Sequence, residues 1–229
     1  MHDFPFDIVG FDLDGTLLDT HQDLGMAVNH ALTLAGRPAE PLTAMRDLIG
    51  GGARKMLERA LARQGALPDD EFRAIYKELL TYYEANIAVH TRLFPGGEAM
   101  LDDLAARGAK LAVVTNKFEY LARHVLGELG LIDRFFTVIG GDTMGKGRAK
   151  PAPDQLYEMI ARGGGGAAAY VGDTTYDTRG AKAAGLPCVA VSFGFNDVPV
   201  GDMEADAVID HFDELIPALE NLQPNRAGA

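Results

Sequence analysis

The sequence has only one cysteine, Cys188, and fewer basic than acidic residues. A single cysteine excludes an intrachain disulfide framework and any zinc site built from several thiolates, and it suits a reducing compartment. The 21 Lys and Arg against 33 Asp and Glu give a formal net charge of −12. Such a chain repels phosphate backbones and anionic lipids, so we expect no nucleic-acid partner and no membrane-surface partner.

Long apolar runs are also lacking. No run approaches the roughly 18–20 residues that a membrane-spanning helix needs, and residues 1–4 lack the basic start and the cleavage site of a signal peptide. With 47% hydrophobic and 24% charged residues, the composition is that of an ordinary globular protein. We therefore expect a cytoplasmic protein with one large domain, or one domain that carries an insert.

Short apolar runs bounded by turn residues recur along the chain and predict buried strands of a parallel sheet. The first run is residues 6–11. Three more runs are similar and two shorter ones could join the sheet: residues 110–116, 168–173 and 187–192, then 135–139 and 207–209. Helical patterns separate these runs, and some end at a glycine such as Gly108 or Gly130. The alternation predicts an α/β fold whose parallel sheet is covered by helices on both faces.

Residues 19–93 break this alternation because no strand-like run occurs there. Instead, three stretches have helical patterns: residues 23–35, 53–64 and 69 to about 89. A Pro-Gly-Gly sequence at residues 95–97 ends the region. We predict an all-helical insert at residues 19–93, an α/β core from residues 1–18 and 94–229, and a disordered tail at residues 223–229.

Four polar motifs follow predicted strands, at the edge where an open parallel sheet places its ligand crevice. In the first, Asp12 and Asp14 stand two residues apart and are followed by Gly15 and Thr16. Two carboxylates that leave a buried strand are costly unless a cation or a proton compensates their charge. A tight turn explains Asp14-Gly15 but requires neither a second acidic residue nor the threonine, so the motif indicates a functional site.

The other three motifs are weaker when each is taken alone. Thr115–Asn116, followed by Lys117, could hold a phosphate or could simply begin a helix. Lys150 precedes a Pro-x-Pro sequence and could direct its ammonium to an anion or be solvated. Asp173 and Asp177 are four residues apart, so both can face one point from a strand end and the first turn of a helix. Asp173 could also cap that helix.

Together the motifs read Asp-x-Asp-Gly-Thr, Thr-Asn, Lys-Pro-x-Pro and Gly-Asp-x-x-x-Asp. This order resembles the haloacid dehalogenase-like superfamily over essentially the whole chain. Within it the sequence resembles phosphatases that carry a helical cap between the first two motifs, and residues 48–54 and 94–96 resemble the phosphoglycolate phosphatase-like subgroup. The resemblance implies a Rossmann-like core and a phosphomonoester hydrolase. Its substrate would be a small phosphorylated metabolite, with phosphoglycolate the leading candidate, and it would act as a monomer or homodimer.

The resemblance also implies a role for each motif residue. Asp12 would be the nucleophile that forms an aspartyl-phosphate, and Asp14 would be first the acid and then the base. Mg²⁺ would be bound by Asp12, Asp173 and the backbone carbonyl of Asp14, with Asp177 as a further ligand or as the residue that orients the metal and its waters. A divalent cation and a lysine would also relieve the repulsion between an aspartate and a phosphate dianion. The phosphoryl group would be bound by Thr115, Asn116, Lys150 and Thr16.

Two points remain open at this level. Arg54, beside Lys55 and a glycine loop, could bind a carboxylate at the non-reacting end of the substrate or be a solvated helix residue, and Arg46 has the same two interpretations. The same core motifs also suit a β-phosphoglucomutase-like isomerase or a non-catalytic phosphate- or metal-binding protein. A dehalogenase is less favoured because it has no evident task for Asp14. Phosphonate cleavage would need a Schiff base on Lys55 or Lys77.

Overall fold

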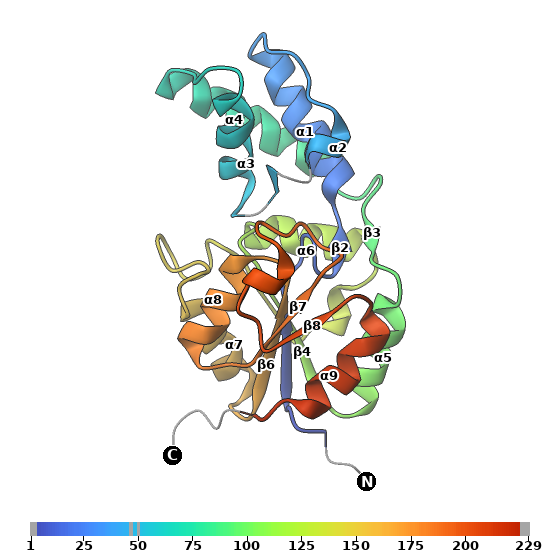
Figure 1. Cartoon of the computed structure of the whole chain (residues 1–229). Helices are drawn as coiled ribbons and strands as arrows, with labels where there is room; N and C mark the ends of the chain where they lie inside the picture. The colour runs from blue at the N-terminus through green and yellow to red at the C-terminus, as the bar shows by residue number, and fades with distance from the viewer. Residues whose placement is uncertain (1–3, 46–47, 50, 225–229) are drawn as a thin grey trace.

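The computed structural model describes residues 4–45, 48–49 and 51–224. These residues contain a parallel six-stranded sheet in the order β5-β4-β1-β6-β7-β8 (Figure 1). Its strands are β1 (Ile8–Phe11), β4 (Lys110–Val114), β5 (Thr137–Ile139), β6 (Ala168–Gly172), β7 (Cys188–Val191) and β8 (Ala207–Ile209). Each lies in a run that the sequence predicts as a strand, so the α/β prediction is confirmed.

Strand β1 lies at the centre of the sheet and determines where the motifs meet. It pairs with β4 on one side and with β6 on the other, and all four of its residues are buried. Burial on both faces explains why its sequence is continuously apolar. Phe11 is in register with Val113 and Val171, so β1, β4 and β6 end at the same edge. The strand order reverses around β1, which is where open α/β sheets place their ligands.

Helices cover both faces of the sheet. They are α5 (Gly97–Ala106), α6 (Glu119–Glu128), α7 (Asp154–Gly163), α8 (Thr175–Ala184) and α9 (Leu215–Asn221). Successive strand side chains face opposite sides. Val9 and Phe11 accordingly pack in one core with α5, α6 and α9, whereas Ile8 packs in a second core with α7 and α8. This two-sided burial holds the central strand in place.

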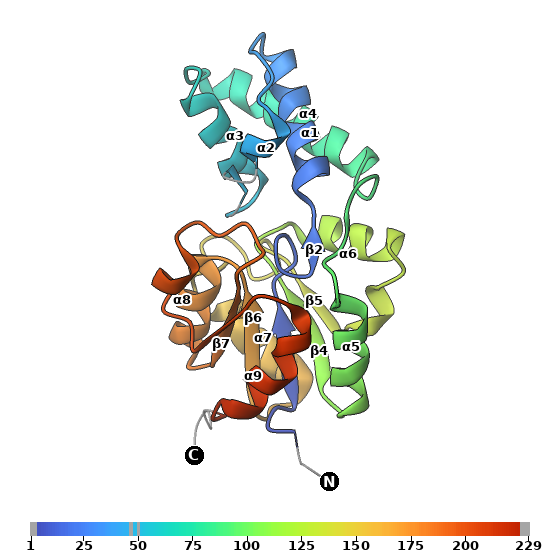
Figure 2. The ribbon, with the colours of Figure 1, turned by 45° about the vertical axis from the view of Figure 1, so that its right-hand side comes forward.

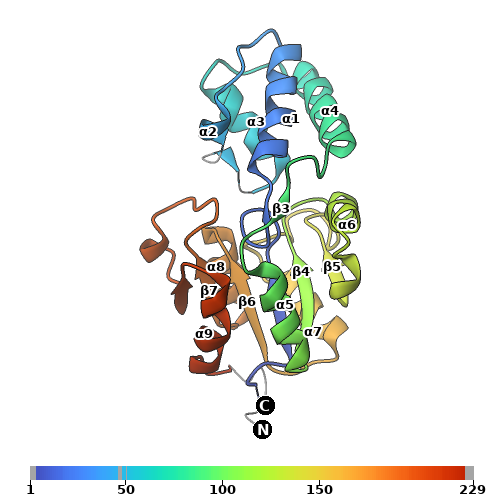
Figure 3. The same ribbon diagram turned by 90° about the vertical axis from the view of Figure 1, so that its right-hand side faces the viewer.

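A group of helices lies above the carboxyl edge of the sheet (Figures 1 and 3). It consists of α1 (His21–Leu34), α2 (Leu42–Met45), α3 (Ala53–Ala62) and α4 (Asp69–Ala85). The three longer helices lie in the stretches that the sequence predicts as helical. Helix α2 is missed because four residues are too few to show a helical period, and α4 ends four residues earlier than predicted.

Two extended connections join these helices to the core, and they correct the prediction of an all-helical insert. Strand β2 (Leu18–Asp19) pairs antiparallel with β3 (Arg92–Leu93), beside each other below the helices (Figure 2). Strand β3 lies inside the region predicted to be wholly helical, and two residues are too short for a recognisable strand pattern. The predicted boundary at residues 18/19 falls within β2, and the one at residues 93/94 falls directly after β3.

Asp23, in the first turn of α1, holds the two connections together. Its carboxylate is buried and accepts hydrogen bonds from the backbone N–H groups of His90 and Thr91 and from the Thr91 hydroxyl, at 2.8–3.1 Å. These residues immediately precede β3. A buried carboxylate with several donors fixes the start of the helical group to its end.

Candidate active site

A cavity of about 350 Å³ lies at the carboxyl edge of the sheet, where the helical group faces the core. Residues from all four motifs line it: Asp12, Asp14, Thr115, Asn116, Lys150, Asp173 and Asp177. The parallel register explains this convergence, because each motif directly follows a strand or begins a helix at that edge. Residues that lie far apart in the sequence therefore share one cavity.

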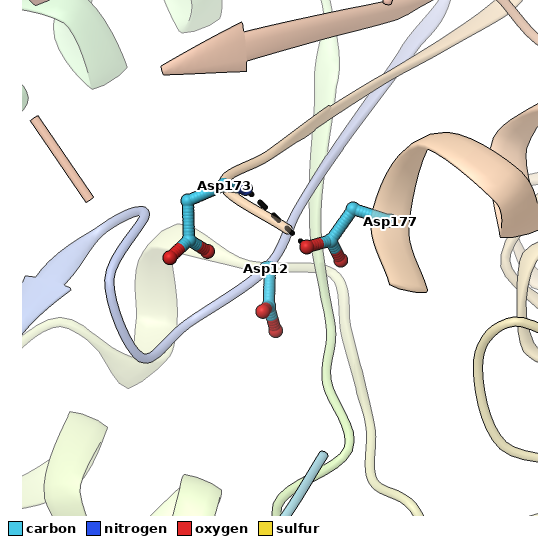
Figure 4. A group of neighbouring side chains, drawn as sticks. All are labelled: Asp12, Asp173 and Asp177. Carbon is cyan, nitrogen blue, oxygen red and sulfur yellow. Dashed lines mark hydrogen bonds between the residues drawn. The ribbon is translucent and has the colours of Figure 1, made fainter. Parts of the chain in front are cut away.

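Three carboxylates form a cluster in this cavity (Figure 4). One oxygen each from Asp12, Asp173 and Asp177 lies within 4.8 Å of the others. Burial raises the pKa of Asp12 to about 6, although Lys150 opposes this change. Burial, and then the charges of Asp177 and Asp12, raise the pKa of Asp173 well above its usual range. Crowding of these buried carboxylates disfavours their charged forms, and an all-oxygen donor set of this kind fits a hard divalent cation such as Mg²⁺.

The loop of the first motif fixes the Asp173 carboxylate. Thr16 donates its hydroxyl to Asp173 Oδ1 at 2.8 Å, and the backbone N–H of Phe195 donates to Oδ2 at 2.8 Å. Gly15 has a φ of +90°, and a Cβ there would lie 2.2 Å from Asp173 Oδ2, so only glycine fits. The sequence predicts Thr16 as a phosphate-binding residue, whereas its hydroxyl in this structure donates to Asp173. Its side chain is fully buried and supports Asp173 in the described structure, and the residues lining the cavity do not include it.

Lys150 brings a positive charge to the base of the cluster. Its side chain is 1% exposed, and its Nζ lies 3.0 Å from Asp12 Oδ1, 2.5 Å from Asp177 Oδ1 and 2.6 Å from the hydroxyl of Tyr170. Burial lowers the pKa of Lys150, but Asp12 and Asp177 outweigh that effect and raise it. The ammonium therefore stays charged between two carboxylates.

Asp177 is held by several donors besides Lys150. Its Oδ2 accepts the hydroxyl of Thr174 at 2.6 Å and the backbone N–H groups of Thr174 and Asp173 at 3.0 and 3.3 Å. Thr174 and Asp177 form a capping box, so Thr174 rather than Asp173 caps helix α8. Both Asp177 oxygens accept hydrogen bonds, one of them from the Lys150 ammonium, so this carboxylate is held in a fixed orientation.

Thr115 and Asn116 follow β4 and face the cavity. Gln155 supports this loop by donating to the carbonyls of Thr115 and Gly140 at 2.9 and 2.8 Å. The Asn116 amide donates to the Lys150 carbonyl at 3.0 Å, and its Oδ1 is buried with no hydrogen bond from any described residue. The second and third motifs are thus joined directly.

Lys117 and Tyr170 are functional candidates that the sequence left without a role. Lys117 Nζ donates to both Asp14 oxygens, at 2.9 and 2.8 Å. Tyr170 lies within β6, which reads as an apolar strand, and its hydroxyl donates to the Val114 carbonyl at 2.5 Å. The sequence signal that could have indicated a role for Lys117 is its position directly after Thr115–Asn116. Tyr170 had only the signal of one polar group in a buried strand.

The cap-side arginines give a mixed result. Arg54 lines the cavity, but its guanidinium Nε lies 2.9 Å from Glu58 Oε1 and the group stacks on Phe72, 5.0 Å from the ring centroid. Its side chain is 60% exposed, so this structure shows it paired within the helical group rather than directed at the carboxylates. Arg46 lies outside the described residues.

The chain is similar to known hydrolases over most of its length. A family model described as haloacid dehalogenase-like hydrolase matches residues 9–191. The phosphoglycolate phosphatase of Agrobacterium fabrum is 39% identical over 212 residues, which cover 91% of this chain and 90% of that protein. The phosphoglycolate phosphatase of Caulobacter vibrioides is also 39% identical, covering 93% and 90%. The crystal structure of a predicted phosphoglycolate phosphatase from Haemophilus somnus has a TM-score of 0.85 at 29% identity, covering 93% and 97%.

The chain belongs to the haloacid dehalogenase-like hydrolases, as the order of its motifs predicts. Within that family it is a phosphatase. No helix among the described residues is long and apolar enough to cross a bilayer.

Proposed function

We propose that this phosphatase is a Mg²⁺-dependent phosphomonoesterase that works through an aspartyl-phosphate on Asp12. The observation that supports this most is the position of the Asp12 carboxylate, 3.0 Å from the Lys150 ammonium and beside two further carboxylates in one cavity. Mg²⁺ would be bound by Asp12, Asp173 and the backbone carbonyl of Asp14, with Asp177 orienting the site. Bound there, it would offset the negative charge of the phosphoryl group and of Asp12.

The residues of the cavity can each be given a step. An Asp12 oxygen attacks phosphorus, and the bond from phosphorus to the leaving oxygen breaks as Asp14 donates a proton to that oxygen. Water then attacks the phosphoryl group, Asp14 accepts its proton, and inorganic phosphate leaves with Asp12 restored. Thr115, Asn116 and Lys150 would bind the phosphoryl oxygens through both steps.

We propose phosphoglycolate as the substrate, with neither a nucleic acid nor a membrane as a partner. The names of the 39% identical relatives support it, and a cavity of about 350 Å³ suits a small metabolite. Contact between Arg54 and the substrate carboxylate would require the guanidinium to leave Glu58, which an exposed ion pair allows at low cost. We propose a monomer or homodimer located in the cytoplasm.

The test is phosphate release from a panel of small phosphomonoesters that includes phosphoglycolate, with Mg²⁺ or EDTA. We expect a preference for phosphoglycolate that EDTA and the Asp12→Asn substitution both abolish. Asp133→Asn, at an exposed position, is the matched control and should keep full activity. Conversion of a sugar phosphate to an isomer that keeps its phosphate, without phosphate release, would replace this proposal by the mutase alternative.

A further inference from the structure

Two lysine–tyrosine contacts among the described residues join the helical group to the core. Lys117 of the core lies over the ring of Tyr83 in α4, with its Nζ 4.5 Å from the ring centroid. Lys55 in α3 lies over the ring of Tyr176 in α8 at 4.6 Å, and its Nζ is 3.1 Å from the Tyr176 hydroxyl. Each body thus supplies one lysine and one tyrosine to the contact between them.

The two contacts differ in burial and in what else they touch. The Lys117 side chain is 5% exposed and Tyr83 is 1% exposed, whereas Lys55 is exposed. Lys117 also donates to both oxygens of Asp14, the proposed acid and base. The exposed contact of Lys55 with Tyr176 therefore joins only two surfaces. The buried contact of Lys117 with Tyr83 is also connected to Asp14.

The ring of Tyr83 shields the ion pair between Lys117 and Asp14. A cation over an aromatic face is stabilised more strongly when water is excluded, and an ion pair also weakens as water enters. Burial raises the pKa of Tyr83 to about 12, so the phenol stays neutral and does not compete with Asp14 as an anion. The ring lies over the Lys117 ammonium, and the charge of Lys117 in turn opposes the rise in the pKa of Tyr83.

We infer that Lys117 is a positioning residue that holds Asp14 through one carboxyl oxygen while the other oxygen carries the proton that passes to the leaving oxygen, and that Tyr83 keeps Lys117 in place while the helical group covers the cavity. This inference rests on the proposed role of Asp14. It makes the acid step depend on the helical group, through one side chain from each body. Attack by Asp12 does not depend on this link, because Lys150 and Asp173 come from the core alone.

The test compares kcat/KM for two substrates whose leaving groups differ. An alkyl phosphate needs a proton on its leaving oxygen, whereas the p-nitrophenolate of p-nitrophenyl phosphate leaves without one. Both values report events up to formation of the phosphoenzyme, so later hydrolysis does not enter. We expect Lys117→Met to lower kcat/KM for the alkyl phosphate by about 10²-fold and for p-nitrophenyl phosphate by roughly 3-fold or less.

Variants at Tyr83 and double variants test the link itself. Tyr83→Leu should lower the alkyl-to-nitrophenyl ratio of kcat/KM in the same direction, whereas Tyr83→Phe, which keeps the ring, should lower the ratio less than Tyr83→Leu does. Lys117→Arg keeps the positive charge, so its alkyl-to-nitrophenyl ratio of kcat/KM should be closer to the wild-type ratio than that of Lys117→Met. In the double variant Lys117→Met with Tyr83→Leu, the effects should be no larger than for Lys117→Met alone, because both act through one contact.

The exposed contact provides the control. Lys55→Met and Tyr176→Phe should change kcat/KM for both substrates by the same factor. The inference is overturned if Lys117→Met lowers both substrates equally, or if the Lys117 and Tyr83 effects simply add, with circular dichroism showing folded variants. Failure of the wild-type protein to hydrolyse either ester would instead contradict the proposed function.

Discussion

Lys150 supplies the positive charge that balances two carboxylates of the site. Its ammonium lies between the carboxylates of Asp12 and Asp177, and Tyr170 takes a further hydrogen bond from it. All of these groups are buried or nearly so. A buried charge that loses its partner is costly, so this lysine supports the fold in addition to its proposed role in binding a phosphoryl group.

Replacing Lys150 should therefore affect activity and stability together. Lys150→Met should lower kcat by at least about 10²-fold, because a charge that stabilises the transition state is lost. It should also lower the free energy of unfolding by about 3–5 kcal/mol, because two carboxylates are left without their cation. Steady-state kinetics and urea unfolding measure the two effects. Lys182→Met is the control: that lysine pairs with Glu204 on the surface, so both quantities should stay near wild type.

At the scale of secondary-structure elements, the site is positioned by short strands and by buried side-chain contacts between them. The strands were predictable from the sequence because burial on both faces makes β1, β4 and β6 continuously apolar. The ribbon of β2 and β3 was not, since its strands have two residues each.

The candidate site was likewise predictable only in part. Asp12 and Asp173 directly follow strands, Asp177 lies in the first turn of the helix after Asp173, and parallel strands end at a common edge. The ion pair of Lys117 with Asp14 spans 103 positions of sequence, and the bond from Thr16 to Asp173 spans 157. Neither interaction leaves a local pattern in the sequence, so only the three-dimensional structure reveals the two contacts.

The Asp23 carboxylate should be essential for attaching the helical group. Asp23→Ala leaves the His90 and Thr91 donors without their buried acceptor, and we expect a loss of about 2–4 kcal/mol in the free energy of unfolding. Amide hydrogen exchange at residues 90 and 91 should become faster. Asp133→Ala, at an exposed position, is the control. Equal stability of the two variants would show that the hydrogen bonds of His90 and Thr91 to Asp23 contribute little.

The molecule as a whole places an acidic site inside an acidic chain. With a net charge of −12 and three clustered carboxylates, the protein should gain most from a bound cation at this cavity. The helical group lies above the sheet (Figure 3) and supplies some of the residues that line the cavity. Stability, metal binding and access of substrate are thus linked at one edge of the fold.

Stability of the metal-free protein should consequently depend on pH. The pKa of Asp12 is raised from 3.8 to about 6, so its contribution to stability is fully favourable below about 4 and is lost as the pH rises through 6. Mg²⁺ should restore that loss, because it replaces the proton on the carboxylates. The increase in Tm on adding Mg²⁺ should therefore be large at pH 8 and small at pH 5. An increase that is equal at both values would contradict a metal site built on Asp12.

The covalent role of Asp12 is tested most directly by isolating the intermediate. The enzyme is mixed with substrate and Mg²⁺, quenched with acid within one turnover, digested and examined by mass spectrometry. We predict that the peptide containing Asp12 carries one phosphoryl group, formed no more slowly than the enzyme turns over, and that Asp12→Asn carries none. Turnover at the wild-type rate with no phosphoryl group on that peptide at any quench time would contradict the mechanism.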